Sequence, residues 1–166
     1  MNLPLPRDVF DSALAVAGLA AATIASAWIF QLQGYPPCDL CYQQRYAYYV
    51  GVPLAVALLA LAKAGTPLAP LRVGMAVLAL VFLANFALAI YHSGVEAKLW
   101  QGPTACTAGA ALPASGADLL TQLQTVKVVR CDEVGVRVFG LSLANWNILI
   151  SGALAALAAR AVGLKR

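Results

Sequence analysis

The stretch "LRVGMAVLALVFLANFALAIY", residues 71–91, decides the fold. After Arg72 it contains no acidic or basic side chain. Its length matches the ~20 apolar residues that an α-helix needs to cross the hydrocarbon core of a bilayer. The stretch therefore predicts a transmembrane helix.

Three more apolar stretches of similar length follow the same rule, at residues 12–32, 46–62 and 143–162. The second is short and contains Pro53, which a membrane helix tolerates when its neighbours satisfy the freed carbonyl. The chain is 61% hydrophobic and only 11% charged, which is too apolar for the surface of a soluble domain of 166 residues. We expect an all-α integral membrane protein, in which residues 1–166 form a single membrane domain with a four-transmembrane-helix bundle.

The first span resembles a secretory signal peptide, because Arg7 precedes it and residues 25–27 are small. Its apolar run is longer than a signal core, and three more spans follow. We therefore expect the first helix to be uncleaved.

The basic residues predict the orientation. Four spans place both termini on one side and the loops 33–45 and 92–142 on the other, and the short loop carries Arg45 as its single base. The bases on the side of the termini are Arg7, Lys63, Arg72, Arg160, Lys165 and Arg166. The positive-inside rule places both termini in the cytoplasm and both loops in the periplasm. The net charge of +4 then reflects orientation in the lipid bilayer and indicates no nucleic-acid partner.

All four cysteines lie in these two outer loops: Cys38, Cys41, Cys106 and Cys131. Disulfides persist outside the cytoplasmic membrane, and four cysteines allow three pairings. Structural disulfides suit the long loop, where a ring of about 25 residues would add roughly 3 kcal/mol. A short CxxC ring adds little. Zinc sites usually combine two close pairs of ligands, and only one such pair is present, so we expect no metal. Thiol–disulfide exchange is the third interpretation.

The sequence around the CxxC favours exchange. Residues 36 and 37 are both proline, so the second helix begins at or after position 37, with Asp39 as a candidate N-cap. Cys41 then lies in the first turn, where the positive end of the helix dipole stabilises a thiolate. Arg45 is four residues further on and would lower the pKa of the Cys41 thiol again. The alternative role for Arg45 is structural: its long side chain would anchor the helix at the membrane interface.

A thiol pair at a membrane surface needs an acceptor for two electrons. The sequence has no CxxCH haem motif and no Gly-rich nucleotide loop. A quinone, which reaches the site through the bilayer, fits this requirement. We expect its ring between Tyr46 and Tyr49, with a carbonyl directed to Arg45. The single histidine, His92, could deliver a proton or simply cap the third span.

The long loop contains a second predicted feature. In residues 117–129 the apolar side chains recur at helical spacing, which predicts a short amphipathic helix. Cys106 lies in the Gly- and Ala-rich part before it. Two acids follow Cys131 and disfavour its thiolate, so Cys106 is the expected first contact for a partner.

These motifs together resemble the DsbB family of disulfide-generating membrane proteins. The resemblance covers nearly the whole chain. It rests on the four spans, Cys38-Asp39-Leu40-Cys41 followed by Arg45, Pro103-Thr104-Ala105-Cys106, Cys131 and "FGLSLANWN" at residues 139–147.

The resemblance implies a multi-pass protein of the bacterial inner membrane that reoxidises a periplasmic DsbA-like thiol oxidase. It implies that Cys106–Cys131 is attacked first, that Cys131 then attacks Cys38, and that Cys41 passes electrons to the quinone pool. It also implies ubiquinone, with menaquinone as the alternative. A vitamin K epoxide reductase-like protein has similar chemistry, but its CxxC follows its loop cysteines. A membrane module with static disulfides is the non-enzymatic alternative.

Overall fold

The computed structural model describes residues 8–103 and 129–164 and has four long helices. They are α1 (Val9–Leu32), α2 (Asp39–Lys63), α3 (Leu68–Glu96) and α6 (Leu143–Val162). All four are long and apolar enough to cross a membrane. The predicted four-span, all-α bundle is confirmed. The first three helices begin three to seven residues before the predicted spans. The largest difference is at α2, whose first two turns contain Asp39, Gln43 and Arg45 and so carry no continuous apolar signal.

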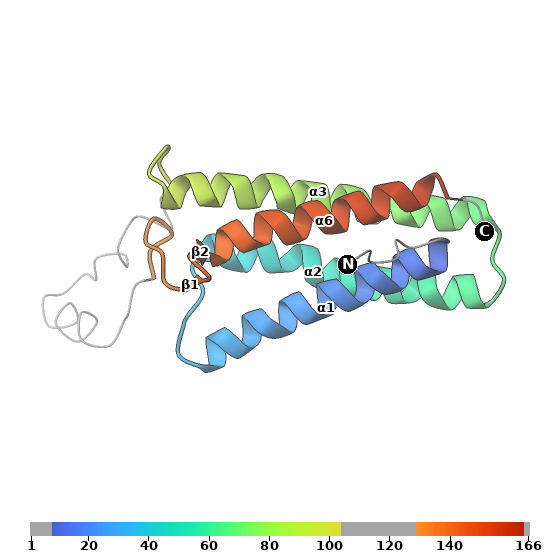
Figure 1. The fold of residues 1–166 in the computed structure, drawn as a ribbon, viewed down its shortest axis with the longest axis horizontal. Coiled ribbons are helices and arrows are strands. Elements are labelled where there is room, and N and C mark those ends of the chain that lie inside the picture. Colours follow the sequence, from blue (N-terminus) through green and yellow to red (C-terminus); the bar gives the residue numbers. More distant parts are fainter. Residues whose placement is uncertain (1–7, 104–128, 165–166) are drawn as a thin grey trace, which may run out of the picture.

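The four helices run side by side along the length of the molecule (Figure 1), and each packs mainly against two others. The most extensive contact joins α3 to α6, and α1 packs on α2 and α6. Small residues make these approaches close: Ala13, Ala17 and Ala20 of α1 and Ala155, Ala158 and Ala161 of α6 are all buried. In a bilayer, where the lipid is as apolar as the side chains, such close backbone packing is what holds helices together.

Helix ends reverse the chain with similar geometry. At the end of α1 the N–H of Gly34 donates to the carbonyl of Gln31, and that of Tyr35 donates to Phe30. This is a Schellman motif, and Gly34 has the left-handed φ of +92° that it requires. The turn after α2 repeats the motif around Gly65, with a φ of +80°. The chain thus returns across the bundle after only a few residues.

One end of the bundle holds both ends of the described chain and the α2–α3 turn (Figure 1). There a guanidinium nitrogen of Arg72 donates to the carbonyl of Leu164 at 2.9 Å. The opposite end holds the cysteine-bearing segments. A two-stranded hairpin, β1 (Arg137–Val138) and β2 (Leu141–Ser142), leads into α6 there, and the sequence analysis did not predict it. The predicted helix over residues 117–129 lies outside the described residues except at Val129, which is not helical.

The contact of α2 with α3 depends on a glycine. A Cβ at Gly51 would lie 2.6 Å from Cζ of Phe82, which is fully buried and packs edge-on against Tyr48. We predict that Gly51→Leu lowers the free energy of unfolding by about 1–3 kcal/mol, the usual cost of overpacking. Thermal unfolding in detergent measures the effect. Gly18→Leu is the control, since nothing lies within 4 Å of a Cβ there. Equal stability of the two variants would contradict the close approach.

Candidate functional site

The two cysteines of the CxxC lie at the start of α2, as Pro36 and Pro37 led us to expect. The N-cap is Cys38 rather than the expected Asp39. Its Sγ accepts a hydrogen bond from the backbone N–H of Cys41 at 3.3 Å, and Asp39 is the first helical residue. A sulfur therefore occupies the position where an oxygen of Ser or Asp usually caps a helix.

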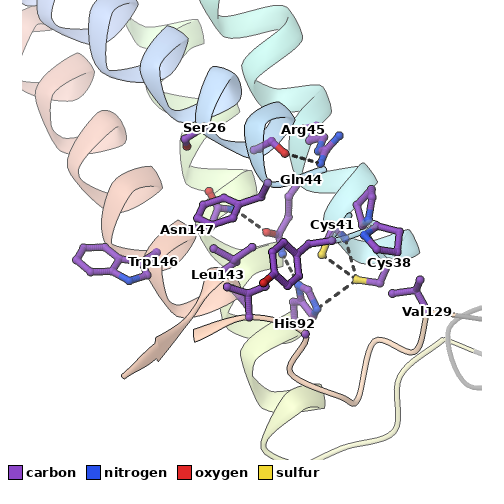
Figure 2. Close-up of a pocket in the computed structure, with 18 of the residues that line it drawn as sticks. Ser26, Cys38, Cys41, Gln44, Arg45, His92, Val129, Leu143, Trp146 and Asn147 are labelled. Carbon is purple, nitrogen blue, oxygen red and sulfur yellow. Dashed lines mark hydrogen bonds between the residues drawn. The ribbon is translucent and has the colours of Figure 1, made fainter. Parts of the chain in front are cut away.

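The two sulfurs lie 2.9 Å apart, and both cysteines are free thiols. Cys38 is buried and Cys41 is partly exposed. The only histidine of the chain joins them from α3, with Nε2 of His92 at 3.6 Å from Sγ of Cys38. Figure 2 shows Cys38 between Cys41 and His92.

The negative charge of the reduced pair belongs to Cys38. The pKa of its thiol is lowered from 9.0 to about 5, first because the Cys41 thiol donates a hydrogen bond to it and then because His92 faces it. Burial opposes this effect. The sequence analysis assigned the thiolate to Cys41, and that assignment is corrected here. The capping geometry directs the donors of the first turn at Cys38.

Arg45 does not contact either sulfur by a hydrogen bond among the described residues. Its guanidinium donates instead to Oε1 of Gln31 at 2.6 Å and to the carbonyl of Ala27 at 3.3 Å, both on α1, and it lies over the ring of Tyr42. The side chain is buried. It therefore joins α2 to α1 beside the cysteines.

A cavity of about 190 Å³ connects these groups. Both cysteines, Arg45 and His92 line it, together with apolar side chains of α1 and α6 such as Ile24, Phe30, Leu143 and Ile150. The aromatic residues that line it are not the predicted ones. Tyr46 and Tyr49 are exposed on the outer side of α2, where Tyr49 accepts a hydrogen bond from Trp28. Tyr35 and Tyr48 line the cavity in their place.

A chain of buried amides and hydroxyls extends from His92 into the bundle. Nδ1 of His92 lies 3.0 Å from Nε2 of Gln44, and Oε1 of Gln44 accepts from Asn147 at 2.6 Å. Oδ1 of Asn147 accepts in turn from Tyr48 and from Ser151. The sequence analysis missed these residues. A polar residue within an apolar span was the signal that could have found Asn147 and Ser151.

The second cysteine pair is only partly described. Cys131 is fully buried and disulfide-bonded, and neither Cys38 nor Cys41 is its partner. Cys106 lies outside the described residues. Cys131 packs in one apolar cluster with Cys38, Leu40 and Val95. The disulfide-bonded cysteine and the capping cysteine of α2 thus share one buried environment.

The ligand atoms of Cys38, Cys41 and His92 lie within 4.8 Å of one another, so a metal must be considered. Two sulfur ligands of a tetrahedral zinc ion, each at ~2.3 Å, are ~3.8 Å apart. The sulfurs here are 2.9 Å apart, which is too close for both to bind one ion. The arrangement suits a pair that forms and breaks a sulfur–sulfur bond.

Comparison with known proteins agrees with this chemistry. A family model described as "Disulfide bond formation protein DsbB" matches residues 11–161. The chain is 33% identical over 160 residues to "Disulfide bond formation protein B" of Azoarcus sp. (strain BH72), covering 94% of this chain and 93% of the relative. It is 21% identical over 140 residues to an uncharacterized protein of Rickettsia prowazekii (strain Madrid E), covering 83% and 76%. No solved structure matches the chain.

The titration of the reduced pair can be tested directly. Because folding lowers the pKa of Cys38, its thiolate stabilises the fold fully above pH 9, and this contribution is lost as the pH falls toward 5. In a Cys106→Ser, Cys131→Ser background we predict a thiolate absorbance that titrates near pH 5. Cys41→Ala should raise the midpoint by about one pH unit or more, because it removes the main donor. Cys41→Ser keeps a donor and is the control. An unchanged midpoint in Cys41→Ala would contradict the assignment.

Proposed function

Because the chain belongs to the DsbB family of disulfide bond formation proteins, we propose that it is a quinone-dependent protein-dithiol oxidoreductase. In this proposal it reoxidises a periplasmic DsbA-like thiol oxidase and passes the electrons to the membrane quinone pool. The observation that carries the proposal is the shared apolar cluster of Cys131 and Cys38. It brings a disulfide-bonded cysteine and a free dithiol within one buried site, as exchange between them requires.

The proposed exchange starts at Cys106, which we take to be the disulfide partner of Cys131. A thiolate of the reduced protein partner attacks Cys106, and Cys131 leaves as a thiolate. Cys131 then attacks Cys38 of the closed Cys38–Cys41 disulfide, which forms a Cys38–Cys131 bond and releases Cys41. The second thiol of the partner protein releases the partner as a disulfide and frees Cys106. Cys106 restores its bond to Cys131, so that Cys38 and Cys41 are left as a reduced pair.

The reduced pair then needs an acceptor for two electrons and two protons, which a bound quinone supplies. The cavity beside the pair fits a quinone ring, since an apolar cavity of about 150 Å³ already accommodates benzene and this one measures about 190 Å³. We propose that Arg45 holds a ring carbonyl. Two of its five N–H donors are used by Gln31 and Ala27, and the guanidinium lines the cavity. His92 would lie at the sulfur side of the ring. Tyr46 and Tyr49 would have no direct contact with it.

We propose that the cysteines face the periplasm of a bacterial inner membrane. The ends of the described chain and the α2–α3 turn, which Lys63 and Arg72 flank, share one end of the bundle, and the start of α2 with its CxxC lies at the other end (Figure 1). Six bases flank the first end, and Arg45 is the single base of the short loop at the other end. The long loop carries four bases and four acids and is too long to weigh in the positive-inside rule, so the short segments support a cytoplasmic position for the first end. Exchange with a disulfide oxidase also needs the oxidising side of the membrane.

Turnover tests the relay. Purified protein is mixed with a reduced thioredoxin-fold dithiol protein and a soluble ubiquinone analogue, and loss of quinone absorbance is followed. We predict turnover in the unmodified chain and none above background in Cys41→Ser or Cys106→Ser. Gln43→Ala, on the exposed side of α2, is the control. Full turnover in either cysteine variant would contradict the proposed order of exchange.

The role of Arg45 separates binding from exchange. A hydrogen bond to a charged group contributes about 1.5–3 kcal/mol, so we predict that Arg45→Ala raises the apparent KM for the quinone roughly 10- to 100-fold. The rate of attack by the protein dithiol should change much less. Gln31→Ala is the matched control, because it removes the side-chain bond of Arg45 to α1, leaves the bond to the Ala27 carbonyl and keeps the guanidinium. A quinone KM that rises equally in both variants would assign Arg45 a structural role alone.

A further inference from the structure

The hydrogen bonds around His92 all run in one direction. Nδ2 of Asn85 on α3 donates to Oγ of Ser151 at 2.8 Å, and Ser151 donates to Oδ1 of Asn147 at 3.2 Å. Nδ2 of Asn147 donates to Oε1 of Gln44 at 2.6 Å. Ser151 and Asn147 each accept one of these hydrogen bonds and donate the following one. Only Nε2 of Gln44, a donor, is then left to face His92.

The ring of His92 must complement its neighbours on both sides. Nδ1 faces the amide N–H of Gln44 at 3.0 Å, so it has to accept. Nε2 faces two acceptors, Sγ of Cys38 at 3.6 Å and a carboxylate oxygen of Glu96 at 3.9 Å. Glu96 is itself held by the hydroxyl of Ser142, which donates to its other oxygen. The reversed chain would direct the lone pair of Nε2 at a thiolate and a carboxylate, which is repulsive.

We propose that Gln44, oriented by Asn147, holds His92 as the neutral tautomer with its proton on Nε2, and that this N–H donates to Cys38. Gln44 and Asn147 are thus positioning residues, which act on the sulfur through His92. Figure 2 shows the path from Asn147 through Gln44 and His92 to Cys38. In such a chain each bond polarises the next, which strengthens the last donor.

The proposal assigns a task to His92 that differs from proton delivery. With an amide N–H facing Nδ1, that ring nitrogen accepts a hydrogen bond, and the donor of the ring is directed at Cys38. Its N–H stabilises the negative charge on Cys38, and the Cys41 sulfur, 2.9 Å away, donates its hydrogen to the same sulfur when Cys38 is the thiolate. The chain therefore adds a third donor to the sulfur that the helix start and Cys41 already favour as the anion. The inference deepens the proposed function, because it describes the reduced pair that the quinone would oxidise.

The single histidine makes the test direct. In reduced protein labelled with ¹⁵N-histidine in detergent, the two ring nitrogens give distinct NMR signals when one is protonated and the other is not. We expect a protonated Nε2 and a bare Nδ1. A protonated Nδ1 in the unmodified chain would overturn the proposal. This result does not depend on turnover, so it is separate from a failure of the quinone reaction.

Two variants test the role of Gln44. Gln44→Glu replaces the donor at Nδ1 by a carboxylate, so we expect Nδ1 to become protonated. Gln43→Glu adds the same charge one residue earlier on the exposed side of α2, and it should keep the tautomer of the unmodified chain. A bare Nδ1 in Gln44→Glu, or the same change in both variants, would overturn the proposal. Asn147→Leu removes the donor to Gln44 without touching His92, and we expect it to give a mixture of tautomers. An unmixed Nε2–H signal there would exclude Asn147 from the orienting chain.

Discussion

The sulfur of Cys38 caps α2, and the arrangement of side chains around the CxxC depends on this one interaction. Pro36 and Pro37 keep the helix from starting before position 37, and the cap falls on the first cysteine of the CxxC. The free N–H groups of a first turn favour an anion at the cap. The backbone of the first turn alone therefore favours the thiolate form of a cysteine at the cap position. Arg45, Gln44 and Tyr48 follow on the same helix, and their positions relative to the sulfur are fixed by its start.

The sequence was sufficient for the helices and the location of the thiol pair, and insufficient for the neighbours of that pair. Apolar runs of this length indicate membrane-spanning helices, because inside a bilayer the backbone must satisfy its own hydrogen bonds, as a helix does. Two prolines before a CxxC indicate a helix start for similarly local reasons. The contact of Gln44 with Asn147 joins residues 103 positions apart and depends on the rotation of α2 and α6 about their axes. Hydropathy contains no information about that rotation. The rotation of α2 about its axis also explains why Tyr48, rather than Tyr46 or Tyr49, lines the cavity.

The buried polar chain is not needed to hold the bundle together. Hydrogen bonds between membrane helices contribute only about 0.6–2 kcal/mol each to stability. Close packing of buried alanines also stabilises the bundle, in the halves of α1 and α6 that lie away from the CxxC. A polar group left without a partner in the same place would cost more than its bond contributes. Amides at Gln44, Asn85 and Asn147 are thus a risk to stability that an apolar residue would not carry. Their convergence on the single histidine beside the thiol pair fits a role in the chemistry of that pair.

The asymmetry of the two sulfurs follows from the spacing of the CxxC at a helix start. The first cysteine lies outside the helix, where it accepts hydrogen bonds and packs against the cluster that contains Cys131. The second lies one turn inside the helix, where its backbone N–H is a donor to the first and its side chain borders the cavity. Both thiols border the cavity and the cluster of Cys131, but Cys38 is buried in that cluster and Cys41 is only packed against its edge. The start of α2 therefore gives the two thiols of one CxxC unequal burial and different hydrogen-bonding roles, and His92 adds its contact to the sulfur that already accepts.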